Sequence, residues 1–226
     1  MAAGTGTLCA VERRGRVHVI TLTGAGEHRL SPALLSAIRS AVAAARASPG
    51  GAGALVLAAE GKFFSNGYDL AWARAGPDPA GRVSAMRAAL RDLVADLVAL
   101  AAPTVAAVMR AARGFLYMSE VDAGIKIVDF VAELLRGKVP DAAARRDLVM
   151  KGEKMTAAEA VRRGVVDAAV DGGADDVVAA AVALAEELAG KGWDGETVAE
   201  IRKTTWPALW RKVKDYGGEA PARPRL

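Results

Sequence analysis

The sequence predicts an α/β protein, and two observations support this fold class. Short apolar runs of strand length recur between longer segments whose apolar residues follow a helical period. The 226 residues contain no low-complexity linker and no internal repeat. We therefore expect one core, residues 1–190, followed by a C-terminal helical region with a basic tail, residues 191–226.

The chain begins with an expected hairpin and helix. Leu8–Val11 and Val17–Leu22 alternate apolar and polar residues and flank a charged turn that ends in glycine, which predicts a β-hairpin. Ser31 precedes a proline, a pair that is typical of a helix N-terminus, and we expect this helix over Ala33–Ala47.

The middle of the chain is expected to supply three buried strands and two helices. Ala54–Ala58 is fully apolar, as a strand covered on both faces would be. Asp69–Ala75 is expected to be a short helix that Asp69 caps, and the period of Arg82–Ala102 predicts a longer helix. The apolar runs Thr104–Val108 and Gly114–Val121 are the expected second and third buried strands.

The C-terminal half is expected to be mainly helical. Pro140–Met150 and Asp175–Ala189 have helical character, and the sequence TAAE at 156–159 is a capping box that starts a further helix. Val165–Val170 is expected to be a strand or an extended stretch. The last helix, Glu196–Val213, contains a proline that predicts a kink.

The junction between the second and third expected strands is too short for these two strands to lie next to each other in parallel. Six residues, 109–114, separate Val108 from Phe115, whereas a parallel crossover needs about a dozen or more. The two strands therefore either pair as a hairpin, or a segment is missing between them.

Composition and charge exclude several classes of protein. The single cysteine, Cys9, cannot form an internal disulfide, and with two histidines no metal site is expected. No segment has the length and apolarity of a membrane span, and no signal peptide is expected. The positive charge lies in residues 201–226, with seven basic and two acidic side chains. Trp206 and Trp210 share a helix face there and are expected to pack on the core, so we expect no nucleic-acid partner.

Five segments, in order, resemble the enoyl-CoA hydratase/isomerase (crotonase) superfamily. Lys62–Leu70, KFFSNGYDL, is similar to its first signature. Residues 20–32 and 103–108 resemble its N-terminal hairpin with the first helix start and the strand that leads into its second signature. Residues 117–121 and 156–167 resemble its acidic catalytic strand and its T-A-x-E-A segment. The resemblance covers about residues 7–205, is strongest to the plant peroxisomal enoyl-CoA delta isomerase branch, and implies a crotonase-like spiral of ββα units with a C-terminal helical region.

The resemblance implies an isomerase that acts on acyl-CoA thioesters in the β-oxidation of unsaturated fatty acids. In such a site a carboxylate moves a proton from C2 to C4 of a 3-enoyl thioester, while backbone N–H groups bind the thioester oxygen. By position the carboxylate is Glu120, and one oxyanion-hole N–H is that of Tyr68. The residues implied in binding substrate and CoA are Ser65, Asn66, Gly67, Tyr68 and Arg29. No separate cofactor is implied, because coenzyme A is part of the substrate.

Simpler roles remain open for several of these residues. Glu120 could be a strand residue that pairs with a surface arginine, and Ser65–Gly67 could be an ordinary turn. His18 and His28 are expected to be surface or hydrogen-bonded histidines, and Cys9 a small core residue.

The chain departs from the family after Val108. The second signature, which would supply the second oxyanion N–H and the hydratases' second glutamate, has no counterpart, and about twenty residues are missing by comparison with the family. Because both flanks match well, a single deletion is indicated. Two alternatives follow: a catalytically silent member that binds acyl-CoA or co-assembles with paralogues, and, less favoured, an enoyl-CoA hydratase.

The end of the chain resembles a targeting signal. Pro224, Arg225 and Leu226 are similar to a plant variant of the C-terminal peroxisomal tripeptide. We therefore expect a peroxisomal location and an import receptor as partner. The family resemblance further implies a homo-oligomer of the trimer type.

Overall fold

A computed structural model of the chain describes residues 7–24, 26–48, 50–108 and 114–214. Its central feature is a four-stranded sheet in the order β1-β2-β3-β4, with β1 (Cys9–Arg14), β2 (Val17–Leu22), β3 (Ala54–Ala59) and β4 (Thr104–Ala106). β1 and β2 form an antiparallel hairpin, and β2, β3 and β4 run parallel to one another.

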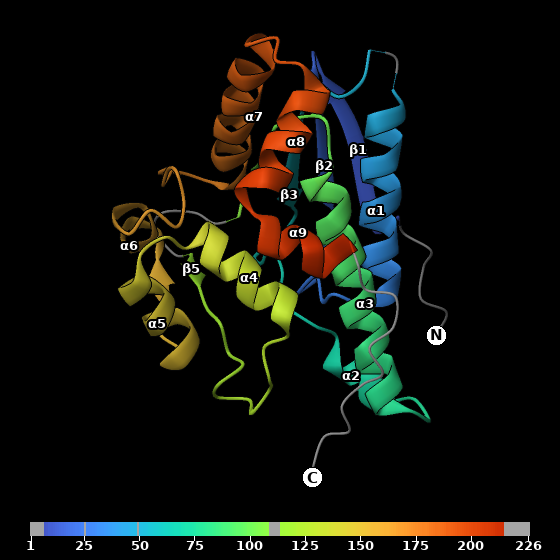
Figure 1. Cartoon of the computed structure of the whole chain (residues 1–226), viewed down its shortest axis with the longest axis vertical. Coiled ribbons are helices and arrows are strands. Elements are labelled where there is room, and N and C mark those ends of the chain that lie inside the picture. Colours follow the sequence, from blue (N-terminus) through green and yellow to red (C-terminus); the bar gives the residue numbers. More distant parts are fainter. Residues whose placement is uncertain (1–6, 25, 49, 109–113, 215–226) are drawn as a thin grey trace.

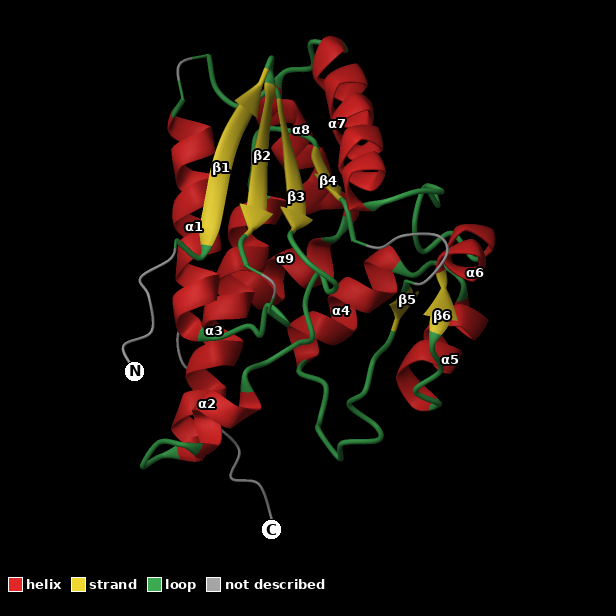
Figure 2. Ribbon diagram, turned by 180° about the vertical axis from the view of Figure 1, so that it is seen from behind, coloured by secondary structure: helices red, strands yellow, loops and turns green. Residues whose placement is uncertain are grey.

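Helices cover both faces of this sheet. α1 (Pro32–Ala47) and α3 (Pro79–Val98) connect the parallel strands and cover one face, whereas α7 (Ala174–Gly190) covers the other (Figures 1 and 2). Strand alternation explains this arrangement: Ile20 of β2 packs toward α1, and Val19 packs toward α7. Nearly every residue of β2 is therefore buried.

A second, smaller unit contains the short antiparallel pair β5 (Phe115–Leu116) and β6 (Met155–Thr156). The helices around it and after it are α4 (Asp129–Lys138), α5 (Ala142–Met150), α6 (Ala157–Arg162), α8 (Gly195–Thr205) and α9 (Pro207–Lys214). α9 packs on α3 and α4 through an apolar cluster that includes Leu209, Trp206 and Trp210. The two tryptophans thus pack on the core, as expected.

Arg202 fastens α8 to the end of α3 and to the start of β4. Its guanidinium donates hydrogen bonds of 2.9 Å to the carbonyl oxygens of Leu97, Leu100 and Ala102. Leu97 lies in the last turn of α3, and Leu100 and Ala102 come directly after this helix, where a cation is favoured by the helix dipole. None of the helices in the described parts of the chain is long and apolar enough to cross a membrane.

Several local predictions are confirmed. Ser31 accepts a hydrogen bond from the backbone of Leu34 at 3.3 Å, and Thr156 with Glu159 forms the expected capping box. The final helix breaks at Trp206, directly before Pro207, which separates α8 from α9. The hairpin is longer than expected, because β1 continues to Arg14 and the turn lies at residues 15–16.

Two predictions about strands are wrong, and of the two alternatives for Val165–Val170, a strand or an extended stretch, the strand is excluded. Thr104–Val108 is not a buried strand: β4 has three residues, and Thr104 and Ala106 are exposed at the edge of the sheet. Gly114–Val121 is not a long strand, because β5 ends at Leu116 with its partner β6. Val165–Val170 contains no strand. The sequence pattern also missed α4, and helix 82–102 is shifted to Pro79–Val98.

β4 and β5 belong to different sheets, so the hairpin alternative for the short junction is wrong. Among the described strands, β4 forms hydrogen bonds only with β3. The Leu55 N–H donates to the carbonyl of Pro103, and the Ala107 N–H donates to the carbonyl of Leu57. Alternate residues of a strand face opposite neighbours, so the N–H and C=O groups of Thr104 and Ala106 point away from β3. Among the described residues no strand pairs with this edge. The junction residues 109–113 lie outside the described residues.

Candidate active site

The loop after β3 is held in place by the segment that precedes α1. The Ser65 hydroxyl donates to the carbonyl of His28 at 2.8 Å and accepts from the N–H of Gly67 at 3.3 Å. The N–H of Asn66 donates to the carbonyl of Glu27 at 3.0 Å. Gly67 has a φ of 72°, a left-handed conformation that favours glycine and turns the chain just before Tyr68. The predicted turn is therefore a rigid, hydrogen-bonded loop.

The backbone N–H of Tyr68 is presented by this loop without an acceptor. Leu30 pairs with Tyr68 in an isolated parallel bridge, in which the Leu30 N–H donates to the Gly67 carbonyl at 2.8 Å and its carbonyl accepts from Asp69 at 3.5 Å. In a parallel bridge the central residue directs its own N–H to the opposite side. No described residue accepts a hydrogen bond from the Tyr68 N–H. The group is available to an oxygen of a bound molecule.

Asp69 starts the helix that follows. Its carboxylate accepts from the N–H of Trp72 at 2.9 Å and caps α2 (Leu70–Arg74), as predicted. α2 then packs on α3. The guanidinium carbon of Arg82, on α3, lies 3.9 Å from the centroid of the Trp72 ring, and the same guanidinium donates a hydrogen bond of 2.6 Å to the backbone carbonyl of Trp72. This helix anchors the loop from its C-terminal side.

Glu120 lies in a turn and not on a strand, which corrects the sequence prediction. The N–H of Ala123 bonds to the carbonyl of Ser119 at 2.9 Å, and that of Ile125 to the carbonyl of Glu120 at 2.8 Å. The strand stops early because its partner β6 has only two residues. The Glu120 side chain is half-buried and makes no hydrogen bond or ion pair with any described residue. It therefore does not pair with a surface arginine.

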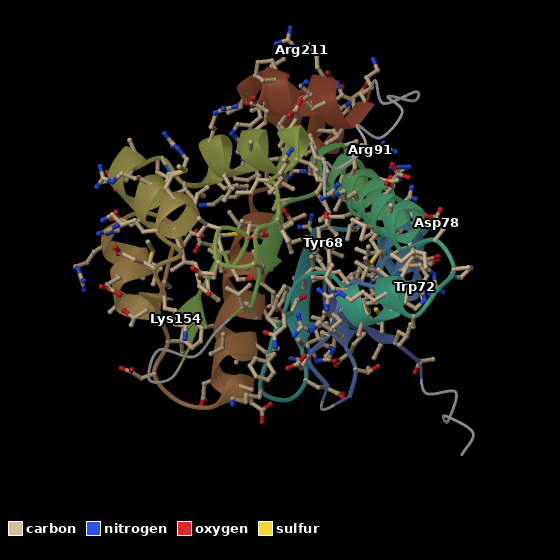
Figure 3. The ribbon with its side chains drawn as sticks, turned by 90° about the horizontal axis from the view of Figure 1, so that it is seen from below. Tyr68, Trp72, Asp78, Arg91, Lys154 and Arg211 are labelled. Atoms are coloured by element: carbon tan, nitrogen blue, oxygen red, sulfur yellow. The ribbon has the colours of Figure 1, made fainter. Side chains whose placement is uncertain are left out.

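Glu120 and Tyr68 are linked through the electrostatics of the Tyr68 phenol. Burial raises the pKa of the Tyr68 phenol to about 12, the charge of Arg87 on α3 opposes this shift, and the charge of Glu120 adds to it. Both charges therefore act on the same phenol, from α3 and from the turn at 119–124. Figure 3 shows Tyr68 nearer the centre of the view than Trp72. Arg87 had no distinguishing signal in the sequence, where it is one polar residue of a helical period.

The remaining sequence candidates are arranged differently. Arg29 is exposed, bonds to Glu27 at 2.8 Å and to the carbonyl of Asn66, and so braces the loop from outside. His28 is buried with a φ of 46°, and its Nε2 lies 2.9 Å from the carbonyl of Glu60. His18 is buried, and its Nε2 lies 3.1 Å from the Ser48 hydroxyl. Cys9 is half-buried and packs against the core.

Two groups of candidates cannot be placed. The missing segment, which would carry a second oxyanion donor, is expected next to residues 109–113, and these lie outside the described residues. Pro224, Arg225 and Leu226 also lie outside the described residues. Within the described ranges, no three His, Cys, Asp or Glu side chains gather as a metal ion would need.

Comparison with known proteins identifies relatives of high similarity. No protein-family model matches the chain. It is 40% identical over 224 residues to the Arabidopsis thaliana protein "Enoyl-CoA delta isomerase 2, peroxisomal", with 89% of this chain and 93% of the relative covered. It is 39% identical over 226 residues to "Enoyl-CoA delta isomerase 3" of the same plant, covering 91% and 95%.

Solved structures share the fold at low sequence identity. A probable enoyl-CoA hydratase, EchA3, from Mycobacterium tuberculosis superposes with a TM-score of 0.81 at 19% identity, covering 92% of each chain. The EchA3 enoyl-CoA hydratase of Mycobacterium marinum gives 0.80 at 18% identity, with 92% of this chain and 95% of the other covered. These likenesses confirm the predicted fold class.

The alignments contain positions that have no counterpart in this chain. The 224 aligned positions of the first relative cover 89% of 226 residues, which is about 201 residues. About 23 aligned positions therefore face gaps in this chain. A gap of this size matches the segment of about twenty residues that the family resemblance predicts to be missing after Val108.

Proposed function

Because the chain belongs to the enoyl-CoA delta isomerase branch of the crotonase superfamily, we propose that it shifts the double bond of a 3-enoyl-CoA to the 2-trans position. The observations that support this proposal are the Tyr68 N–H, which donates to no described residue, and the carboxylate of Glu120, whose charge raises the pKa of the Tyr68 phenol. The first binds an oxyanion, and the second moves a proton.

The oxyanion donor acts on the thioester oxygen. Removing a proton from C2 places negative charge on this oxygen, and a donor that is already aimed at the oxygen stabilises that charge without reorganisation. The loop 65–68 fixes the Tyr68 N–H through hydrogen bonds to residues 27–30. The residues Ser65, Asn66 and Gly67 thereby position the donor, whatever contacts they make with CoA.

The proton moves through Glu120. Its carboxylate takes the proton from C2, the C3=C4 double bond shifts to C2=C3, and the same carboxylate returns the proton to C4, so that substrate and product have the same composition. A carboxylate that no described residue neutralises is free to do this. The reaction needs no redox cofactor, because no electron leaves the substrate.

We further propose that the activity is reduced by the missing segment. The alignment gaps and the open edge of β4 both support the loss of the second oxyanion donor. The same observations favour the alternative function, a chain that binds acyl-CoA or joins intact paralogues without turning over substrate. A hydratase is less supported, because the second signature, which supplies the hydratases' second glutamate, has no counterpart in the sequence.

The site of action proposed is the peroxisome, in the β-oxidation of unsaturated fatty acids. Two relatives carry the word peroxisomal in their names, and the tripeptide at 224–226 has the form of a targeting signal. An import receptor and a second and third copy of this chain are the proposed protein partners.

The test is the product that the purified chain makes from 3-hexenoyl-CoA. An isomerase yields 2-trans-hexenoyl-CoA, which has the mass of the substrate and a conjugated thioester chromophore. A product that is one water heavier would establish hydration instead. Binding without conversion would establish the silent alternative.

A further inference from the structure

The segment that carries Glu120 is held in place without strand pairing. β5 ends at Leu116, and residues 117–124 pair with no strand in the described part of the chain. The Glu120 carboxylate makes no hydrogen bond or ion pair with a described residue, so its position depends on the backbone that carries it. A group that transfers a proton must be held within reach of the reacting carbon. The contacts that fix this turn are therefore part of the site.

A side-chain hydrogen bond closes the segment around Glu120. The Tyr117 hydroxyl donates to the carboxylate of Asp122 at 2.5 Å, and these two residues lie on either side of Glu120 in the chain. The backbone hydrogen bonds of the same turn run from residues 123–125 back to residues 119–121, so the hydroxyl supplies the link to the residues before them. Hydrogen bonds to a charged oxygen are shorter and stronger than neutral ones. The bond to Asp122 is the main cause that raises the pKa of Tyr117, so the phenol stays a donor at neutral pH.

The loop before β6 contacts both partners of this hydrogen bond. The Lys154 Nζ atom lies 5.1 Å from the centroid of the Phe115 ring and 5.5 Å from that of Tyr117. Gly152 lies directly against Asp122, because a Cβ atom at this glycine would be 2.8 Å from the carboxylate oxygen Oδ2. Tyr117 is 39% exposed, but its ring and its hydroxyl are both engaged. The hydrogen bond is thus supported by the unit that contains β5 and β6.

We propose that Tyr117 and Asp122 are positioning residues for proton transfer by Glu120. Their hydrogen bond fixes the turn, and the turn directs the Glu120 carboxylate to the carbons between which the proton moves. Neither side chain exchanges a proton with the substrate: Tyr117 keeps its proton, and Asp122 accepts the hydrogen bond. This inference rests on the isomerase function proposed above, and it adds two residues to which the family resemblance assigns no role.

Tyr117→Phe tests the inference, because it removes only the hydroxyl. The net strength of one hydrogen bond corresponds to a ratio of rates of about 3- to 10-fold, so kcat for 3-hexenoyl-CoA should fall by about this factor. KM should change little, because the loop at 65–68 and the Tyr68 N–H are unaltered in this variant.

Variants of Asp122 separate the hydrogen bond from the charge. Asp122→Ala should lose as much kcat as Tyr117→Phe, and the double variant should lose no more than either single variant, because both remove the same bond. Asp122→Asn keeps an acceptor oxygen for the phenol and should retain most of the parent rate. A loss with Asp122→Asn as large as that with Asp122→Ala would overturn the inference.

Amide hydrogen exchange shows whether the bond holds the turn. In Tyr117→Phe the amides of residues 123–125 should exchange faster than in the parent chain, because their hydrogen bonds lie within the turn, whereas the amides of β3 should be unaffected. Unchanged exchange at residues 123–125 would show that the turn does not depend on the hydroxyl, and the inference would be wrong.

Asp194→Ala is the matched control for stability. Asp194 is exposed and caps α8 by accepting a hydrogen bond of 2.7 Å from the N–H of Thr197, so its loss should lower Tm. This variant should keep the parent kcat. If Tyr117→Phe likewise lowers Tm but keeps the parent kcat, its hydroxyl has a structural role only, which contradicts positioning.

The outcomes also separate this inference from the proposed function. If the parent chain isomerises 3-hexenoyl-CoA and Tyr117→Phe matches its kcat, only the roles of Tyr117 and Asp122 are overturned. If the parent chain does not isomerise the substrate, the proposed function fails and this inference fails with it.

Discussion

Restoring the missing segment is the perturbation whose effect can be worked out furthest. The residues of the Arabidopsis relative that face the gap in this chain would be inserted between Val108 and Met109, where the segment is expected to be missing. A restored oxyanion donor should raise turnover by about 10²- to 10³-fold, the usual cost of losing one. Repositioning of the thioester by the restored helix and strand adds to this gain.

The structure also sets the expected gain in stability. Thr104 and Ala106 have two N–H and two C=O groups at the edge of β4 that pair with no strand in the described part of the chain. If a restored strand pairs with all four, at about 0.5–1.5 kcal/mol for each net hydrogen bond, the free energy of unfolding rises by about 2–6 kcal/mol. For a chain of this size that corresponds to roughly 5–20 °C in Tm.

The assay compares kcat/KM for 3-hexenoyl-CoA and Tm in the parent chain and the insertion variant. A glycine- and serine-rich insert of equal length is the matched control, and it should rescue neither quantity. Equal turnover in the parent chain and the insertion variant would refute the reasoning, because it would show that another backbone N–H already fills the second oxyanion position.

Two further predictions concern stability and location. Asp147 is buried, and its bonds to Lys151 and Arg163, at 2.9 and 2.7 Å, hold its pKa well below the usual range, so it stabilises the folded chain above pH about 4 and loses this effect as pH falls further. Asp147→Asn should therefore lower Tm at pH 7, and the difference from the parent should shrink at pH about 3; an equal difference at both pH values would show that the charge is not the cause. A fluorescent protein that carries the last ten residues should collect in peroxisomes of plant cells, and a diffuse cytosolic signal would refute targeting by the tripeptide at 224–226.

Local signals in the sequence predicted the parts of the fold that short-range chemistry determines. Ser31 with its following proline, the capping box at Thr156 and the break before Pro207 each act within one helical turn, and each is found in the structure. The apolar run Ala54–Ala58 predicted β3 because a strand between two neighbours, under helices on both faces, excludes polar side chains.

Strand pairing was predicted less well because it depends on distant partners. Residues 114–121 are apolar enough for a strand, yet only Phe115 and Leu116 find one, in β6. Thr104–Ala106 reads as a central strand and lies at an edge, because the neighbour expected from the family resemblance has no counterpart. Helix α4 escaped notice because its N-terminus, Val128, supplies no side-chain cap.

The candidate site shows the same division. The family resemblance named Tyr68 and Glu120, and the structure adds that the charge of Glu120 acts on the Tyr68 phenol. Neither the Tyr68 hydroxyl, which finds no hydrogen-bond partner among the described residues, nor the effect of the Arg87 charge on this phenol has a signature in the sequence, because both depend on the folded surroundings of the side chain. Such groups become visible only when burial and hydrogen bonds are assigned atom by atom.

The role of Glu120 as the proton carrier is the central claim, and the turnover of Glu120→Gln tests it most directly. The substitution keeps the shape of the side chain and removes its basicity, so kcat for 3-hexenoyl-CoA should fall by about 10²-fold or more. Glu186→Gln is the matched control, since Glu186 is exposed on α7, across the sheet from α1 and α3; it should retain the parent rate. A Glu120→Gln variant that isomerises the substrate as fast as the parent chain would contradict the account.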